Sequence, residues 1–181
     1  MDEALWPFAA LRIRTPTLEL RYPDDDGLVA LAHLAAEGIH DPAAMPFNVP
    51  WTRAESPELE RNALQHAWGR RASLTRDDWS LPFAVHVDGA VVGVQDLFAK
   101  QFPVRRTVET GSWLVRRADG RGIGTEMRAA VLHLAFAGLG AYEAHSGSFV
   151  DNPASAAVSR HNGYEANGEE IVAREGAPAR L

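Results

Sequence analysis

Three glycines at alternate positions, Gly120, Gly122 and Gly124, stand between a strand-like apolar run at 112–115 and a long helical pattern at 127–137. A strand, a glycine-rich turn and a helix N-terminus in this order present free backbone N–H groups at the positive end of the helix dipole. Glycine has no Cβ to block an approaching ligand. The spacing therefore predicts an anion site, with a phosphate or pyrophosphate as its ligand.

Two well-known phosphate-binding motifs do not fit this glycine pattern. The dinucleotide fingerprint, Gly-x-Gly-x-x-Gly, requires a third glycine where the sequence has Thr125 in one frame and Met127 in the other. A P-loop ends in Gly-Lys-Ser or Gly-Lys-Thr, and the sequence contains neither tripeptide. Taken without any other motif, the turn could also be a plain helix cap that binds nothing.

The glycine turn resembles motif A of the GNAT superfamily of N-acyltransferases, which is written Gln/Arg-x-x-Gly-x-Gly/Ala. Gly122 and Gly124 take the two glycine positions, whereas Asp119 replaces the Gln or Arg. A carboxylate at that position repels a pyrophosphate. We therefore expect the affinity to rest on backbone amides, with Arg117 and Arg121 as compensating cations.

The run from Asn152 to Tyr164 resembles motif B of the same superfamily. Its pattern is Asn-x-x-Ser-x-x-Val-x-x-x-Asn-Gly-Tyr, with Asn152 as the N-cap of a short helix, Pro153 in the first position and Gly163 at the C-terminus. The resemblance implies that the Asn152 side chain meets the pantetheine amides of coenzyme A. One strand-like run, 142–150, separates the two motifs in the expected order.

By this resemblance, the coenzyme A site is built from the end of the strand, the glycine turn and motif B. Backbone amides near the end of the strand would pair with the pantetheine arm and the thioester. The residues expected to bind coenzyme A are Leu114, Val115, Arg117, Gly120, Arg121, Gly122, Ile123, Gly124, Thr125, Asn152, Ser155 and Asn162.

Other segments, at 51–53, 76–82 and 111–114, are similar to the branch of the superfamily that includes the ribosomal-protein N-terminal acetyltransferases. Within that branch, the segment 39–51 is similar to an actinobacterial group that contains a mycobacterial succinyltransferase. The resemblance implies an acetyl-CoA or succinyl-CoA donor and a primary amine as acceptor, which is a protein N-terminus, a lysine or a small amine. It does not identify the acceptor.

Direct attack of an amine on a thioester requires a proton acceptor, a donor that polarises the carbonyl and an acid for the sulfur, but no enzyme nucleophile. Glu109, early on the strand before the glycine turn, is the proposed base, with Asp96 and Asp78 as rivals that are otherwise explained as solvated or capping groups. Ser159 stands where many superfamily members have an acidic tyrosine. A serine hydroxyl is a poor acid, so the acid is left unassigned.

The loop between the first two predicted helices, residues 39–51, is too apolar for an ordinary surface loop. It either walls the acceptor site or packs onto the core. The residues proposed to contact the acceptor or the acyl group are His40, Met45, Phe47, Trp51 and Arg53. Of these, His40 and Arg53 are the candidates for binding a succinyl carboxylate.

Composition narrows the class of protein. A net charge of -6 argues against nucleic acid as a partner and weakly favours a cationic acceptor. The absence of cysteine excludes disulfides and thiolate zinc sites, no two histidines have helical i, i+4 spacing, and no metal is predicted. Without a signal peptide or an apolar run of about 18 residues, we expect a cytoplasmic protein with no membrane partner. A homodimer or higher homo-oligomer is left open.

The elements that must position these groups predict one mixed α/β domain over residues 1–181, with a central mixed sheet flanked by helices. The resemblance implies the GNAT fold, in which the sheet is mostly antiparallel, has a V-shaped splay between the fourth and fifth strands and is flanked by about four helices. Strands are predicted at 11–20 with a proline interruption, 83–87, 91–95, 107–115, 142–150 and 169–174, and helices at 28–38, 58–68 or 58–71, 127–137 and 152–163.

The end of the sequence departs from the GNAT pattern. The fold commonly finishes with one more strand, and residues 176–181 do not suggest one, so we expect the last strand to be missing, through truncation of a longer protein.

An alternative function also remains, a non-catalytic acyl-CoA-binding sensor or scaffold. Asp119 and Ser159 favour it because both depart from the common motifs.

Overall fold

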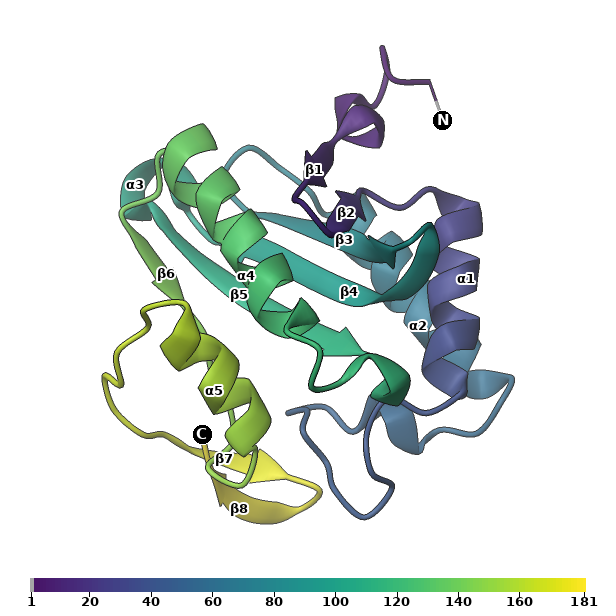
Figure 1. Ribbon diagram of the computed structural model, residues 1–181, viewed down its shortest axis with the longest axis vertical. Coiled ribbons are helices and arrows are strands. Elements are labelled where there is room, and N and C mark those ends of the chain that lie inside the picture. Colours follow the sequence, from purple (N-terminus) through teal and green to yellow (C-terminus); the bar gives the residue numbers. More distant parts are fainter. Residues whose placement is uncertain (1) are drawn as a thin grey trace.

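The computed structural model describes residues 2–181, and its centre is a six-stranded sheet (Figure 1). The strands follow one another in chain order, and all neighbours are antiparallel except the parallel pair β5 and β6. The strands are β1 (Arg12–Arg14), β2 (Leu18–Arg21), β3 (Trp79–Val87), β4 (Ala90–Ala99), β5 (Thr107–Leu114) and β6 (Glu143–His145). The predicted mixed, mostly antiparallel sheet is thereby confirmed.

Helices cover both faces of this sheet. In Figure 1, α4 crosses in front of the sheet and α2 lies behind it. The helices are α1 (Asp25–Ala36), α2 (Glu58–Ala72), the single turn α3 (Phe102–Arg105), α4 (Ile123–His133) and α5 (Pro153–His161), with a π-helical continuation of α4 at Leu134–Gly138 and 3-10 turns at Pro7–Ala10, Trp51–Arg53 and Arg116–Ala118. No helix within residues 2–181 is long and apolar enough to cross a membrane.

The two faces of the sheet can be told apart along β4. Gln95 contacts Arg128 of α4, whereas Val94 packs against Leu31 of α1. Since neighbouring strand residues point to opposite faces, Asp96 lies on the same face as Val94. We call these the α4 face and the α1–α2 face.

The core lies mainly between the sheet and α4. Phe83, Leu97 and Val108 of the strands and Val131 of α4 are completely buried there. Full burial of such a side chain contributes about 1.5–3 kcal/mol to stability, so this layer fixes the position of α4 relative to β5.

The splay is the feature of the sheet that matters most for the site. β5 and β6 pair only from Thr107↔Glu143 to Glu109↔His145. Beyond Glu109, β5 continues to Leu114, and on that side none of the described residues pairs with it in a ladder. These are the predicted fourth and fifth strands, because the prediction counted β1 and β2 as one strand, and the predicted splay between them is confirmed.

The first predicted strand is in fact a hairpin. β1 and β2 pair antiparallel from Arg12↔Arg21 to Arg14↔Glu19. Pro16 lies in the connection, where Thr15 N–H donates to the carbonyl of Leu18 at 3.0 Å. The prediction of one interrupted strand was wrong because proline here reverses the chain.

The last strand is present, contrary to the prediction. β7 (Ile171–Arg174) and β8 (Ala177–Arg180) form a separate two-stranded hairpin beside α5 (Figure 1). Their connection is Glu175 and Gly176, with φ angles of 51° and 81°. Two successive positive φ angles are what a two-residue type I′ hairpin turn requires, and the Glu-Gly pair was the missed signal.

Candidate functional site

The glycine turn after β5 presents a row of unpaired backbone amides. Gly120 and Gly122 have left-handed φ angles of 69° and 78°, and Gly122 is the N-cap of α4. The N–H groups of residues 120–124 have no hydrogen-bond acceptor within residues 2–181, whereas those of Thr125 and Glu126 donate to the carbonyl of Gly122. Successive free amides around alternating left-handed residues, at a helix N-terminus, form an anion-binding nest.

Gly124 has a different role, which the sequence did not reveal. A Cβ at this position would lie 3.2 Å from Cγ2 of Val158 on α5, so glycine allows α4 and α5 to approach closely. The side-chain amide of Asn162 joins the same two helices by donating to the carbonyls of Thr125, at 3.3 Å, and Val158, at 2.9 Å. The two motifs are therefore in direct contact.

Charges near the turn are partly compensated. Arg117 pairs with Glu37 of the α1 end at 3.0 Å, and both side chains are largely exposed. Removal of water by neighbouring groups raises the pKa of Asp119 above its ordinary value, and Arg116 opposes that rise. Arg121 is exposed and takes part in none of the ion pairs formed within residues 2–181.

A hollow of about 520 Å³ lies beside these groups, on the side of the turn that faces α1. It is lined by Glu37, Gly38, Val115, Arg116, Arg117 and Asp119.

Motif B forms the helix that the sequence predicts. Asn152 is the N-cap of α5, where its side-chain oxygen accepts from the Ser155 N–H at 3.1 Å, and Pro153 takes the first helical position. Ser159 is partly buried on this helix, and its carbonyl accepts from the Tyr164 N–H at 3.1 Å. Its hydroxyl has no hydrogen-bond partner among the described residues.

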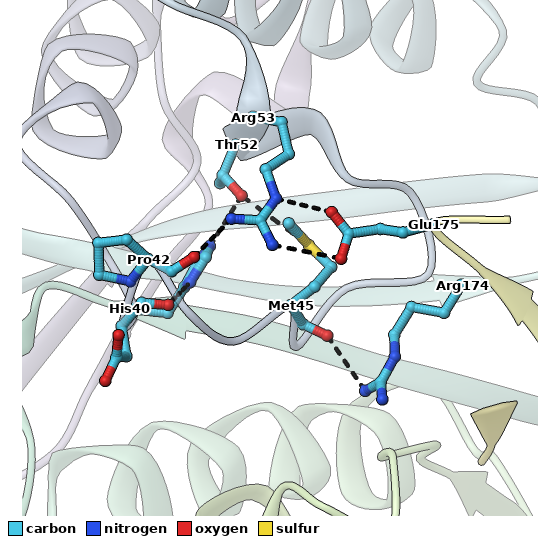
Figure 2. A network of polar contacts seen from close by, with 8 residues as sticks. His40, Pro42, Met45, Thr52, Arg53, Arg174 and Glu175 are labelled. Atoms are coloured by element: carbon cyan, nitrogen blue, oxygen red, sulfur yellow. Dashed lines mark hydrogen bonds and ion pairs between the residues drawn. The ribbon is translucent and has the colours of Figure 1, made fainter. Parts of the chain in front are cut away.

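The loop before α2 is fastened at several points, as Figure 2 shows. Arg53 pairs with Glu175, with Nε 2.6 Å from Oε1, and it also donates to the carbonyl of Pro42. The His40 ring contacts the carbonyl of Asp41 and the hydroxyl of Thr52, each at 2.7 Å. The loop is thus tied both to itself and to the β7–β8 turn.

Aromatic rings continue from this loop to the sheet. Ring centroids lie 5.7 Å apart for His40 and Phe47, 5.4 Å for Phe47 and Trp51, and 6.4 Å for Trp51 and Trp113 of β5. Met45 is buried beside them at 5% exposure. The structure therefore brings the proposed acceptor residues together on the α1–α2 face. Trp113, which sequence reasoning did not single out, joins them to β5.

Two carboxylates lie on that same face. Asp96 stands opposite Gly111 of β5, and burial raises its pKa to about 6, against a lowering by Arg70. Glu109 stands opposite Phe98, so it is the diagonal neighbour of Asp96 and it is exposed. The third candidate, Asp78, is a capping group whose Oδ1 accepts from the Gln101 N–H at 2.8 Å.

A buried polar cluster lies on the other face, beneath α4. Arg128, at 2% exposure, donates to Oε1 of Gln95 at 3.4 Å and to the hydroxyls of Ser112, at 3.2 Å, and Ser146, at 3.0 Å. Gln95 in turn donates to the carbonyl of Gly111 at 2.9 Å. Sequence reasoning missed Arg128 because it resembles any arginine on an amphipathic helix. Residues 2–181 contain no group of three or more His, Cys, Asp or Glu side chains arranged for a metal.

Comparison with known proteins gives one family and many similar structures. The profile of the acetyltransferase (GNAT) domain matches residues 17–165. A Salmonella typhimurium acetyltransferase that modifies the N-terminal serine of 50S ribosomal protein L7/L12 is 22% identical with a TM-score of 0.76, over 94% of this chain and 95% of the other. Mycobacterium smegmatis RimJ, solved with CoA-disulfide, is 22% identical with a TM-score of 0.75, over 94% and 82% of the chains. RimL in complex with coenzyme A is 21% identical with a TM-score of 0.73, over 94% of both chains. At these identities the structures establish the shared fold.

Proposed function

The chain belongs to the acetyltransferase (GNAT) domain family and is an N-acyltransferase that uses a coenzyme A thioester, and from that premise we propose that it moves an acetyl group from acetyl-CoA to the amine of a protein N-terminus. One observation carries the proposal. The unpaired amides of residues 120–124 open beside the splayed end of β5, so that an anion and an extended arm can bind in continuity.

The donor is proposed to bind along the turn and the free edge of β5. The diphosphate accepts hydrogen bonds from the nest between Gly120 and Gly124, and the exposed Arg121 adds positive charge. The pantetheine arm pairs with the unpaired edge of β5 near Leu114 and Val115, as an added strand would. The remaining proposed contacts come from the 3-10 turn before the nest, from the first turn of α4, and from α5 with its two caps, and they are Arg117, Ile123, Thr125, Asn152, Ser155 and Asn162.

The acceptor is proposed to enter from the α1–α2 face, where the loop before α2 meets Trp113. The aromatic rings of Phe47 and Trp51 and the buried Met45 would wall the path, and His40 and Arg53 hold the loop in place. The net charge of -6 supports a cationic acceptor. The likeness to acetyltransferases that act on the N-terminus of a ribosomal protein supports a peptide amine as the first choice.

The proposed reaction is direct transfer in a ternary complex. The amine nitrogen attacks the thioester carbon, a C–N bond forms, and the C–S bond breaks with the electron pair leaving on sulfur. The proton lost by the nitrogen passes to a carboxylate on the α1–α2 face. We propose Asp96 ahead of Glu109 for this role, because a base with a pKa near the working pH is the more effective one and burial holds Asp96 at about 6.

Succinyl-CoA is the second proposed donor. Its additional carboxylate would need a cation near the acceptor path, and Arg53 would have to give up its pair with Glu175 to supply one.

We further propose a cytoplasmic location. A homo-oligomeric state stays a proposal that light scattering on the purified protein decides.

The function is tested by release of free coenzyme A from acetyl-CoA and succinyl-CoA in the presence of peptides with free N-termini. We expect turnover with free peptides, and loss of turnover when the same peptides carry a blocked N-terminus. Peptides with a blocked N-terminus and an internal lysine separate α-amine from ε-amine acceptors. Tight binding of acetyl-CoA without turnover on any amine would favour the sensor alternative, and no binding of any coenzyme A species in calorimetry would overturn the proposal.

Replacement of Ser159 by alanine tests whether this hydroxyl serves as the acid. Because the hydroxyl has no hydrogen-bond partner within the part of the chain that the structure describes, and serine is a poor acid, we expect kcat of Ser159→Ala to stay within about threefold of the wild type. Steady-state kinetics with acetyl-CoA measures this. A loss of 100-fold or more with unchanged thermal stability would assign a chemical role to Ser159.

A further inference from the structure

Arg128 is a buried cation for which residues 2–181 supply no counter-ion. Its partners are the neutral oxygens of Gln95, Ser112 and Ser146, and its guanidinium carbon lies 5.9 Å from the ring centre of Tyr164. None of the ion pairs formed within residues 2–181 includes it. The hydrogen-bond partners of Arg128 are all neutral, so no ion pair within residues 2–181 compensates its positive charge.

Such a charge is costly unless something else balances it. Removing a cation from water without an opposite charge is strongly unfavourable, and an apolar side chain of similar length would fill the same space without that cost. Burial lowers the pKa of Arg128, but a guanidinium remains protonated at physiological pH. The arrangement indicates an anion that is present only while the protein works.

The position of Arg128 tells which anion this is. The β5–β6 ladder stops at Glu109↔His145, and Ser112 and Ser146 stand just beyond that point on the two diverging arms. The guanidinium donates to both serines and therefore lies across the closed end of the splay. An arm that enters from the nest at 120–124 and follows β5 inward carries its sulfur toward this end.

Resting on the proposed function, we propose that Arg128 stabilises the thiolate of coenzyme A as it leaves. When the C–S bond breaks, the sulfur keeps the electron pair and accepts a hydrogen bond from the guanidinium, which retains its own protons. The thiolate takes up a proton from solvent afterwards. The chain then needs no acid at position 159, where it has a serine.

Few other groups near the sulfur can titrate. From β4, β5 and the segment after β6, Arg128 meets only the neutral Gln95, Ser112 and Ser146. The segment after α5 adds the phenol of Tyr164, which contacts the hydroxyl of Thr110 at 3.1 Å. The His145 ring on β6 lies 3.3 Å from Glu143. A pH-dependent signal that vanishes with Arg128 and survives loss of the phenol therefore belongs to the thiol.

The test compares the binding of coenzyme A and desulfo-coenzyme A by calorimetry between pH 6 and 9, without turnover. A simple alkyl thiol such as cysteine has a pKa of about 8.5, and a neighbouring cation lowers it. We expect the affinity for coenzyme A, relative to desulfo-coenzyme A, to rise about tenfold or more with pH in the wild type, because the bound thiol ionises at lower pH than the free one.

Variants then assign the effect. In Arg128→Met the relative affinity becomes independent of pH and kcat with acetyl-CoA falls about 100-fold, whereas Arg128→Lys keeps part of both. Tyr164→Phe keeps the full pH dependence, which excludes the phenol as its source. The inference is overturned if the affinity for coenzyme A relative to desulfo-coenzyme A does not change with pH in the wild type. It is also overturned if this relative affinity rises with pH as much in folded Arg128→Met as in the wild type. If Arg128→Met does not fold, the wild-type and Arg128→Lys measurements still decide. Failure of the wild type to bind either ligand instead overturns the proposed function.

Discussion

Replacement of Gly122 by valine is expected to reduce the affinity for acetyl-CoA by at least about 100-fold. The φ angle of Gly122 is 78°, a region that costs an L-residue about 1–2 kcal/mol and a β-branched one more. Relief of that strain turns the N–H groups of Ile123 and Gly124 away from the ligand. A hydrogen bond to a charged group contributes about 1.5–3 kcal/mol, so loss of two accounts for the expected change.

A matched control separates binding from folding. Gly89, in the β3–β4 turn, has a φ angle of 81°, close to the 78° of Gly122. A Cβ added at either glycine would have no described atom within 4 Å. Gly89→Val therefore introduces the same backbone strain outside the nest. Calorimetry with acetyl-CoA and thermal unfolding should show similar losses of stability for both variants, but weaker binding only for Gly122→Val. Equal affinities in the two variants would remove the nest as the diphosphate site.

The parts of this molecule that sequence predicts well are those set by short segments. Asp88 and Gly89, with φ angles of 50° and 81°, form the turn that the dipeptide indicates, and β3 and β4 follow from alternation on either side. The nest is equally local, because glycines, strand and helix are contiguous. Asn152 caps α5 through a contact three residues away. In each case the interactions that determine the local structure join residues that are close together in the sequence.

What sequence misses depends on distant partners. The role proposed for Arg128 can be recognised only in the fold, which brings Ser112 of β5 and Ser146 after β6 into contact with it. Arg53 could equally be a free cation or half of an ion pair, and its pairing with Glu175 across 122 positions decides the matter. The pKa of Asp96 likewise follows from burial within the sheet, which no local pattern encodes.

The second large effect is expected at Asp96. Replacement by asparagine removes the proposed base while keeping size and polarity, and general base catalysis contributes about 10²–10⁴-fold to rate. We expect kcat/KM for Asp96→Asn to fall at least about 100-fold at pH 7. Below pH 6, the wild-type reaction requires both Asp96 and the acceptor amine to lose a proton. Above pH 6, Asp96 is already deprotonated, so only the deprotonation of the amine still depends on pH. A plot of log(kcat/KM) against pH should therefore change slope from two to one near pH 6, and the variant should show slope one across the same pH range.

Stability should move in the opposite direction to activity. The pKa of Asp96 is raised from 3.8 to about 6 in the folded chain, so the folded state holds an extra proton between these values and its stability falls as pH rises through that window. The full penalty, at most about 3 kcal/mol, is present at pH 7 and absent in Asp96→Asn. The variant should therefore melt at a higher temperature than the wild type at pH 7, with the gain disappearing near pH 4.

Two further variants complete this test. Asp78→Asn removes a capping carboxylate outside the site and should leave kcat/KM unchanged while lowering stability slightly. Glu109→Gln removes the exposed neighbour on the same face and should keep the break near pH 6. If the break instead disappears in Glu109→Gln and persists in Asp96→Asn, the proton passes to Glu109. A more stable but inactive Asp96→Asn cannot be explained by misfolding, and it would show that the sheet keeps an unfavourable half-buried carboxylate because the chemistry requires it.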